Sequence, residues 1–272
     1  MDGDAQDLMA TDDPNNQSAS WTRLGEGTLT EVWTDGVHIK RPMRPWSEAI
    51  HQWLEHLEHG DVAGVPRFVA VEDDTEILTL LPGRAVRRPW TKAVQSLRWM
   101  EQVGRRLRQV HESATDFRLT DGVSFVWGPV QPEPAHVVTH GDLGPWNMIE
   151  RDGQFVGVID WDLARFGDPL DDLAEAAFEL GPLRENRDML GGYVTAQTVR
   201  TRVEALCLGY DQVSADDVLR HVEPFFQRRI DEMTELAADG REPFVDLAEV
   251  GNIEALRDDL EHFREHFKPS RR

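Results

Sequence analysis

The segment spanning residues 140–162 constrains the fold of this chain more than any other. Asp142 and Asn147 lie five residues apart in a stretch rich in glycine and proline, which predicts a loop and not a helix. Two short apolar runs follow, joined by Asp152-Gly153, a dipeptide that predicts a tight hairpin turn in this setting. Because a hairpin returns the chain, Asp160 is expected beside the loop that carries Asp142 and Asn147.

These three side chains have the chemistry that phosphoryl transfer requires. In that reaction one carboxylate accepts the proton of the substrate hydroxyl, while an amide and a second carboxylate hold magnesium. Magnesium prefers a few hard oxygen ligands together with substrate phosphates. Asp142 is therefore the candidate base, and Asn147 and Asp160 are the candidate metal ligands. The alternative is that all three are ordinary turn and strand-end residues, because Asp and Asn favour such places.

The pattern H-x-D-x-x-x-x-N followed by I-D-W-D resembles that of the aminoglycoside phosphotransferase, or phosphotransferase enzyme, family, which is related to the protein kinases. The resemblance implies an α+β, bilobal protein-kinase-like fold, with a small N-terminal antiparallel sheet lobe carrying one helix and a larger, mainly helical C-terminal lobe. It also implies that His140 buttresses the loop, that Asp172 steadies it from below, and that ATP or GTP and Mg²⁺ are the cofactors. For Asp162 several roles stay open: assisting the metal, orienting the loop, capping the next segment or contacting the acceptor.

The N-terminal part contains features expected of a nucleotide site. Residues 1–20 are rich in Asp and Asn and poor in large apolar side chains, which predicts a disordered tail. Alternation around glycines then predicts antiparallel strands, in which Gly25 and Gly27 would let backbone amides approach phosphates. Lys40, one strand later, is the candidate cation for the phosphates. A plain hairpin turn and a solvated edge lysine are the alternatives.

Residues 47–58 have the apolar spacing of a helix, which Ser47 can cap. In kinase-like folds a glutamate on this helix holds the phosphate-binding lysine, so Glu48 is the candidate and Glu55 the reserve. Three histidines crowd the same segment, and we expect surface or helix-end positions for them instead of a metal site: His51, His56 and His59.

A second hairpin, within residues 67–81, is expected to complete the small sheet, and Pro82-Gly83 ends it. The resemblance implies a hinge between lobes at this point, with backbone atoms around Leu80 and Leu81 contacting adenine. The expected division is a tail at 1–20, a nucleotide-binding lobe at 21–82 and a catalytic, substrate-binding lobe at 83–272.

The rest of the chain reads as helical. Asp168 and Asp171 are expected to cap a helix that follows a Gly-Asp-Pro turn, and Cys207 is expected to be buried in an apolar helical context. The other expected helices cover residues 91–111, 197–208, 214 onward with a bend near Pro224, and a single last helix at 243–267.

The acceptor is the least constrained part of the prediction. A formal charge of −21 and a pI near 4.8 argue against nucleic acid or an anionic membrane as partner and favour a cationic ligand. Carboxylates on the last helices are candidates to bind an amino sugar: Asp231, Glu235, Glu254 and Asp258. They also fit the ordinary solvated face of a helix. Aminoglycoside is the best guess, and the family resemblance equally allows choline, another sugar, homoserine or a macrolide.

The leading hypothesis is a magnesium-dependent kinase of a small molecule, located in the cytoplasm because the chain has one cysteine and no apolar segment typical of secretion or membrane spanning. A non-catalytic nucleotide-binding protein of the same fold is the alternative, which the intact set of Asp142, Asn147 and Asp160 disfavours. A protein-modifying kinase is a third possibility, and the short turn after I-D-W-D, in place of a long mobile segment, disfavours it.

Overall fold

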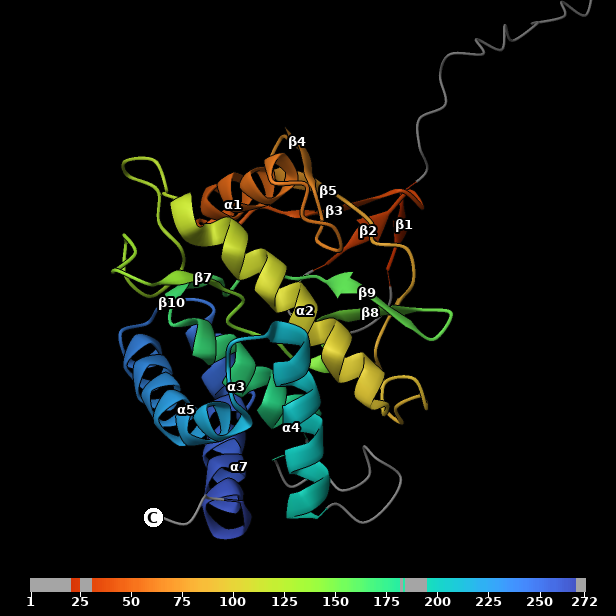
Figure 1. Ribbon diagram of the computed structural model, residues 1–272. Coiled ribbons are helices and arrows are strands. Elements are labelled where there is room, and N and C mark those ends of the chain that lie inside the picture. The colour runs from red at the N-terminus through yellow and green to blue at the C-terminus, as the bar shows by residue number, and fades with distance from the viewer. Residues whose placement is uncertain (1–20, 25–30, 182, 184–194, 268–272) are drawn as a thin grey trace, which may run out of the picture.

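The computed structural model describes residues 21–24, 31–181, 183 and 195–267 of the 272-residue chain. The expected tail at 1–20, and both Gly25 and Gly27, lie outside the described residues. One sheet with α1 lies at the top of the molecule in Figure 1, the helices α3, α4, α5 and α7 lie at the bottom, and α2 crosses between the two parts.

The upper sheet has five antiparallel strands in the order β1-β2-β3-β5-β4. Their bounds are Thr22–Arg23, Trp33–Thr34, His38–Pro42, Phe68–Glu72 and Thr75–Thr79 for β1 to β5. Helix α1, Ser47–His59, buries the apolar face that its spacing predicts, including Ile50 and Trp53. Ser47 is the first helical residue and its hydroxyl accepts from the Arg44 amide at 3.0 Å, so the expected N-cap role was wrong.

A second, three-stranded sheet lies where the two parts of the molecule meet. It consists of β6 (Arg84–Ala85), β8 (Met148–Arg151) and β9 (Gln154–Val158), in the order β6-β8-β9. The hairpin between β8 and β9 turns at Asp152 and Gly153, whose φ angles of 52° and 74° are those of the tight turn that the dipeptide predicts. The pair β7 (Val137–Thr139) and β10 (Arg165–Gly167) forms a separate antiparallel ribbon.

Close backbone contact joins the segment after α1 to this second sheet. The Val158 amide donates to the Gly64 carbonyl at 2.9 Å, and a Cβ at Gly157 would lie 1.9 Å from the same oxygen. Arg106 of α2 donates to the neighbouring Ala63 carbonyl. The two chain segments cross at a distance that only glycine permits, which fixes the upper sheet and α1 over the lower part.

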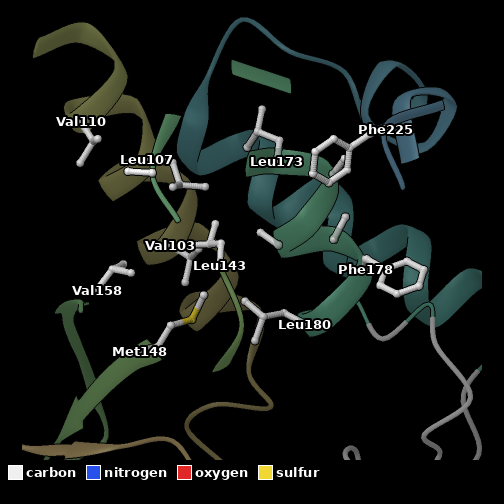
Figure 2. Packing of buried hydrophobic residues seen from close by; sticks show 14 of the residues in the cluster. Val103, Leu107, Val110, Leu143, Met148, Val158, Leu173, Phe178, Leu180 and Phe225 are labelled. Atoms are coloured by element: carbon white, nitrogen blue, oxygen red, sulfur yellow. The ribbon is translucent and has the colours of Figure 1, made fainter. Parts of the chain in front are cut away.

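The lower part is built from six helices among the described residues. They are α2 (Leu97–Ser113), α3 (Pro169–Leu180), α4 (Ala196–Tyr210), α5 (Ala215–Ala238), α6 (Phe244–Glu249) and α7 (Asn252–His266). Figure 2 shows Val103 and Leu107 of α2 in one apolar cluster with Leu143, Met148 and Leu173. Because Leu143 belongs to the 140–147 loop, the core includes a residue of the segment that carries the candidate base. No helix in the described ranges has both the length and the apolar character needed to cross a bilayer.

Three expectations about helices were wrong. The helix expected from residue 91 begins at Leu97, because the Ser96 hydroxyl caps it by accepting from the Trp99 amide at 3.2 Å. The single last helix is divided into α6 and α7 at Gly251, whose φ of 76° is incompatible with a continuous helix. Asp168 is the cap of α3 as expected, accepting from the Leu170 amide at 2.8 Å, but Asp171 is buried in ion pairs. Cys207 is buried, as expected.

Candidate active site

The 140–147 loop connects β7 to β8 and is held by its own side chains. The Asn147 amide donates to the Asp142 backbone carbonyl at 2.9 Å and to the Asp142 carboxylate oxygen Oδ2 at 2.8 Å. Both hydrogens of the amide are therefore used, and its oxygen Oδ1 is the atom that remains to bind a metal. The short 3₁₀ turn Pro145–Asn147 places the two side chains against one another.

Asp160 reaches the same place through the β8–β9 hairpin. The Ile159 amide donates to the Asn147 carbonyl at 2.8 Å, and the His140 ring donates from Nε2 to the Ile159 carbonyl at 3.0 Å. Asp160 itself has a φ of 67°, a conformation that costs energy for a residue other than glycine and that occurs frequently at functional sites. The structure thus joins Asp142 to Asn147 through side chains, and joins Asn147 to the residue before Asp160 through the backbone.

Buried polar groups support the loop from below. The His140 amide donates to both carboxylate oxygens of Asp172, at 2.9 and 3.1 Å. The His111 ring lies between Asp172 and the Tyr210 hydroxyl, at 3.0 Å from each. Burial raises the pKa of Tyr210 to about 12, so the hydroxyl keeps its proton and remains a donor to the ring. The steadying role expected of Asp172 is what the structure shows, whereas sequence analysis missed His111 and Tyr210.

Trp146, which sequence analysis also missed, orients the candidate base. Its indole nitrogen donates to Asp142 Oδ2 at 3.2 Å, so this oxygen receives two donors, one from Trp146 and one from Asn147. The ring packs on Gly144, where a Cβ would lie 2.2 Å from the indole. Asp142 Oδ1 is left as the oxygen that can accept a proton from a substrate.

Arg41 on β3 is a cation that contacts the candidate metal ligand Asp160. Its guanidinium donates to Asp160 Oδ1 at 3.2 Å, to Asp162 Oδ1 at 2.5 Å and to Glu76 Oε1 at 2.7 Å. Only 12% of its side chain is exposed. Asp162 therefore pairs with Arg41.

Lys40 lies on the other face of the same strand, because neighbouring residues of a strand point in opposite directions. Its ammonium group contacts Glu72 at 2.9 Å and lies 5.6 Å from the centre of the Trp21 ring. The structure does not bring Lys40 together with Glu48 or Glu55, both of which are exposed. The expected pairing of a strand lysine with a helix glutamate is absent from the described residues.

Helix α1 contacts the strand cation in a different way. His51 is buried, stacks on Phe68 with ring centres 4.0 Å apart, and hydrogen-bonds to Glu76, which in turn binds Arg41. The surface position expected for His51 was therefore wrong. Helix α1 is thus connected to Arg41 through its own His51 and through Glu76 of β5, and not through a glutamate of α1.

Burial and charge shape the ionisation of this cluster. Burial raises the pKa of Asp162 to about 6, helped by Asp160 and Glu76 and opposed by Arg41. Burial also disfavours the charge of Glu76, but His51 and Arg41 outweigh it and hold the pKa of Glu76 below its usual range. Asp160, with 43% of its side chain exposed, and Asn147 both carry oxygen atoms of the hard type that Mg²⁺ prefers.

The remaining predicted residues lie outside this cluster. Leu80 and Leu81 are half-buried just after β5, and the Leu80 amide donates to the Val37 carbonyl at 2.8 Å. The four acidic candidates of the C-terminal helices are exposed on α5 and α7: Asp231, Glu235, Glu254 and Asp258. Asp231 accepts from Gln227 at 3.0 Å along α5.

A small antiparallel sheet with one helix, joined to a mainly helical part with an Asp-Asn loop at the junction, defines the class of kinase-like phosphotransferase folds. The solved structure of amicoumacin kinase hAmiN with AMP-PNP, Ca²⁺ and Ami superimposes on this chain with a TM-score of 0.64 at 14% identity, covering 90% of this chain and 89% of that one. An ADP-bound aminoglycoside phosphotransferase, APH(2'')-Ib, superimposes with a TM-score of 0.55 at 14% identity, covering 90% and 94%. The predicted bilobal, kinase-like α+β fold is confirmed.

Residues 126–206, which include the loop and the hairpin, match the phosphotransferase enzyme family, so the resemblance seen in the sequence is confirmed. The chain is also 32% identical over 149 residues to the trifolitoxin immunity protein of Rhizobium leguminosarum bv. trifolii. That match covers 52% of this chain and spans about half, 54%, of the relative's length.

Proposed function

We propose that this protein is a kinase of a small molecule, which transfers the γ-phosphoryl group of ATP or GTP to a hydroxyl group of a cationic acceptor. One observation carries the proposal. Asn147 contacts Asp142 through its side chain and the residue before Asp160 through its backbone, so a base and two metal ligands share one site. Phosphoryl transfer depends mainly on such positioning and on neutralising charge.

In this proposal Asp142 is the catalytic base. Its Oδ1 accepts the proton of the acceptor hydroxyl as that oxygen bonds to the γ-phosphorus and the bond to the leaving ADP or GDP breaks, while Trp146 and Asn147 hold Oδ2. His140 keeps the loop in place through the Ile159 carbonyl. Asn147 and Asp160 would hold Mg²⁺, which when bound neutralises the charge of the nucleotide phosphates.

For the nucleotide, we assign the phosphate-binding cation to Arg41 in place of Lys40. The Arg41 guanidinium already contacts Asp160, whereas the Lys40 ammonium is held by Glu72 on the opposite face. Gly25 and Gly27 stay candidates for the phosphate loop. We place adenine against the backbone of Leu80 and Leu81 and the lobe boundary at Pro82-Gly83, because β5 belongs to the upper sheet and β6 to the second one.

The acceptor is proposed to be a compound with ammonium groups, an aminoglycoside or a similar antimicrobial molecule. Net charge, the exposed carboxylates of α5 and α7, and the structural similarity to an aminoglycoside phosphotransferase support this class. Long-range attraction of a cation to these carboxylates would weaken with salt. A cytoplasmic location follows from the need for a nucleoside triphosphate.

The test is nucleotide consumption by the purified chain across a panel of amino sugars, amino alcohols, macrolides and neutral sugars, with and without Mg²⁺. We expect magnesium-dependent turnover with at least one cationic acceptor, and a Michaelis constant for that acceptor that rises with salt. Absence of turnover with every member of the panel, for both ATP and GTP, would contradict the proposed function.

A further inference from the structure

A buried ion pair between two helices lies against the backbone immediately before Asp142. Arg229 of α5 and Glu175 of α3 are 5% and 4% exposed, and the Arg229 nitrogen Nη1 donates to Glu175 Oε1. Removing two charges from water costs free energy that their mutual attraction seldom exceeds by much. Stability alone is therefore a weak reason for a pair at this position.

The arginine of this pair also acts on the loop. The second terminal nitrogen of Arg229, Nη2, donates to the Gly141 carbonyl at 2.7 Å. Burial raises the pKa of the Glu175 carboxyl, and Arg229 opposes that effect. Gly141 directly precedes Asp142 in the chain, so the pair contacts the backbone immediately before the candidate base through Arg229.

The loop has little other freedom at this point. Gly141 has a φ of 77°, and a Cβ there would lie 2.0 Å from the Leu163 carbonyl oxygen. The backbone in front of Asp142 is therefore enclosed by Leu163 on one side and by the Arg229 guanidinium on the other. Burial disfavours the charge of Arg229, but Glu175 and, after it, Asp142 outweigh burial and raise the pKa of Arg229.

We propose that Arg229, held by Glu175, is a positioning residue, which fixes the backbone immediately before Asp142 and connects α5 to the candidate base. The inference deepens the proposed function and rests on it. Because α5 also carries the acceptor candidates Asp231 and Glu235, the pair would fix the position of Asp142 relative to these two side chains.

The competing explanation is a purely structural tie between α3 and α5, and the adjacent residue Arg228 offers a matched control. Arg228 also extends from α5 to a buried carboxylate of α3, donating to Asp171 at 2.8 and 3.0 Å, but its contacts do not include the 140–147 loop. Arg228→Met and Arg229→Met therefore remove the same chemical group from neighbouring positions, and only the second removes a contact to the loop.

The decisive variant replaces both charges with apolar side chains of similar size, Glu175→Leu with Arg229→Met, because this leaves no unpaired buried charge. We expect its melting temperature to stay within a few degrees of the parent. With a responsive acceptor, we expect kcat to fall about 10- to 100-fold while the nucleotide KM changes less than about threefold. Arg228→Met should leave kcat within about twofold.

Hydrogen exchange of the amides of residues 140–147 supplies a readout that needs no turnover. We expect exchange about tenfold faster in the double variant and unchanged in Arg228→Met. If the parent protein phosphorylates none of the acceptors, the proposed function fails. Even then, faster amide exchange in the double variant would support the positioning role of Arg229, and exchange at the parental rate would overturn it. If the double variant does not fold, Arg229→Lys, which keeps the charge and shortens the reach to Gly141, should fold and show the same loss of kcat. Parental kcat in a folded variant would overturn the inference.

Discussion

Arg41 donates from Nη1 to the carboxylate of Asp160 across 3.2 Å, which joins a cation of the upper sheet to a candidate metal ligand of the lower part. The same guanidinium binds Asp162 at 2.5 Å and Glu76 at 2.7 Å. In the proposed function this charge would bind the phosphates of the nucleotide, which need cations on their β and γ oxygens. Its neighbour Lys40 is turned away by the alternation of the strand.

The first prediction compares these neighbours. We expect Arg41→Ala to lower kcat/KM for the nucleotide by about 100-fold, equivalent to about 2.7 kcal/mol of transition-state stabilisation, because a phosphate contact is lost. Lys40→Ala should change kcat/KM by less than about threefold. Steady-state kinetics with varied nucleotide, on variants shown to be folded by circular dichroism, provides the measurement. A larger loss of kcat/KM in Lys40→Ala than in Arg41→Ala would mean that Lys40, and not Arg41, is the phosphate-binding cation.

The contrast between these two residues shows where sequence reasoning succeeds and where it ends. The turn at Asp152-Gly153 is set by local backbone preference, so the hairpin that delivers Asp160 was predictable from the dipeptide. Which of two adjacent cations faces the site depends on how β3 pairs with β5 and on what packs against each face. That information is non-local. For the same reason the sequence did not reveal that His51 is buried or that Glu76 binds both His51 and Arg41.

Helix ends show a similar division. Asp168 and Ser214 are caps recognisable from their neighbours in the chain, and both accept from amides of their own helices. Asp171 has the same local appearance, but partners 50 and 57 residues away, His221 and Arg228, bind it. A carboxylate at a helix start thus does not reveal whether it caps the helix or forms a tertiary ion pair.

The second prediction uses Asp171. Burial disfavours its charge, but His221, Arg228 and Arg165 outweigh burial and lower the pKa of Asp171 below its usual value of about 3.9. Since the folded-state pKa is the lower one, the stabilisation is fully present above pH 4 and is lost as the pH falls through the folded-state value. Asp171→Asn should reduce the free energy of unfolding at pH 7 by about 3 kcal/mol, and this difference should shrink below pH 4.

Urea unfolding of the parent and of Asp171→Asn at pH 7 and at several values below pH 4 measures that difference. Arg228→Met serves as a control for the exposed partner, and it should cost less, because 44% of the Arg228 side chain is in contact with solvent. A difference between parent and Asp171→Asn that grew on acidification would contradict the assignment.

The third prediction concerns the crossing of Gly64 and Gly157. Gly157→Ala places a methyl group 1.9 Å from the Gly64 carbonyl oxygen, so the junction between the two parts must open. We expect a loss of about 3 kcal/mol in the free energy of unfolding. Gly122→Ala is the control: it has a φ of 84° but no atom within 4 Å of the added Cβ, and so should cost only about 1 kcal/mol of backbone strain. Equal effects of the two substitutions would mean that the crossing is not tight.

The most direct test of the account is the rate of acceptor-dependent nucleotide consumption by Asp142→Asn beside the matched variant Asp152→Asn, which changes a carboxylate on the neighbouring hairpin turn. Loss of a general base costs about 10²- to 10⁴-fold in rate. We predict a loss of this size for Asp142→Asn, with nucleotide affinity and melting temperature retained, and parental rates for Asp152→Asn. Near-parental turnover by Asp142→Asn on an acceptor that the parent phosphorylates would contradict the account.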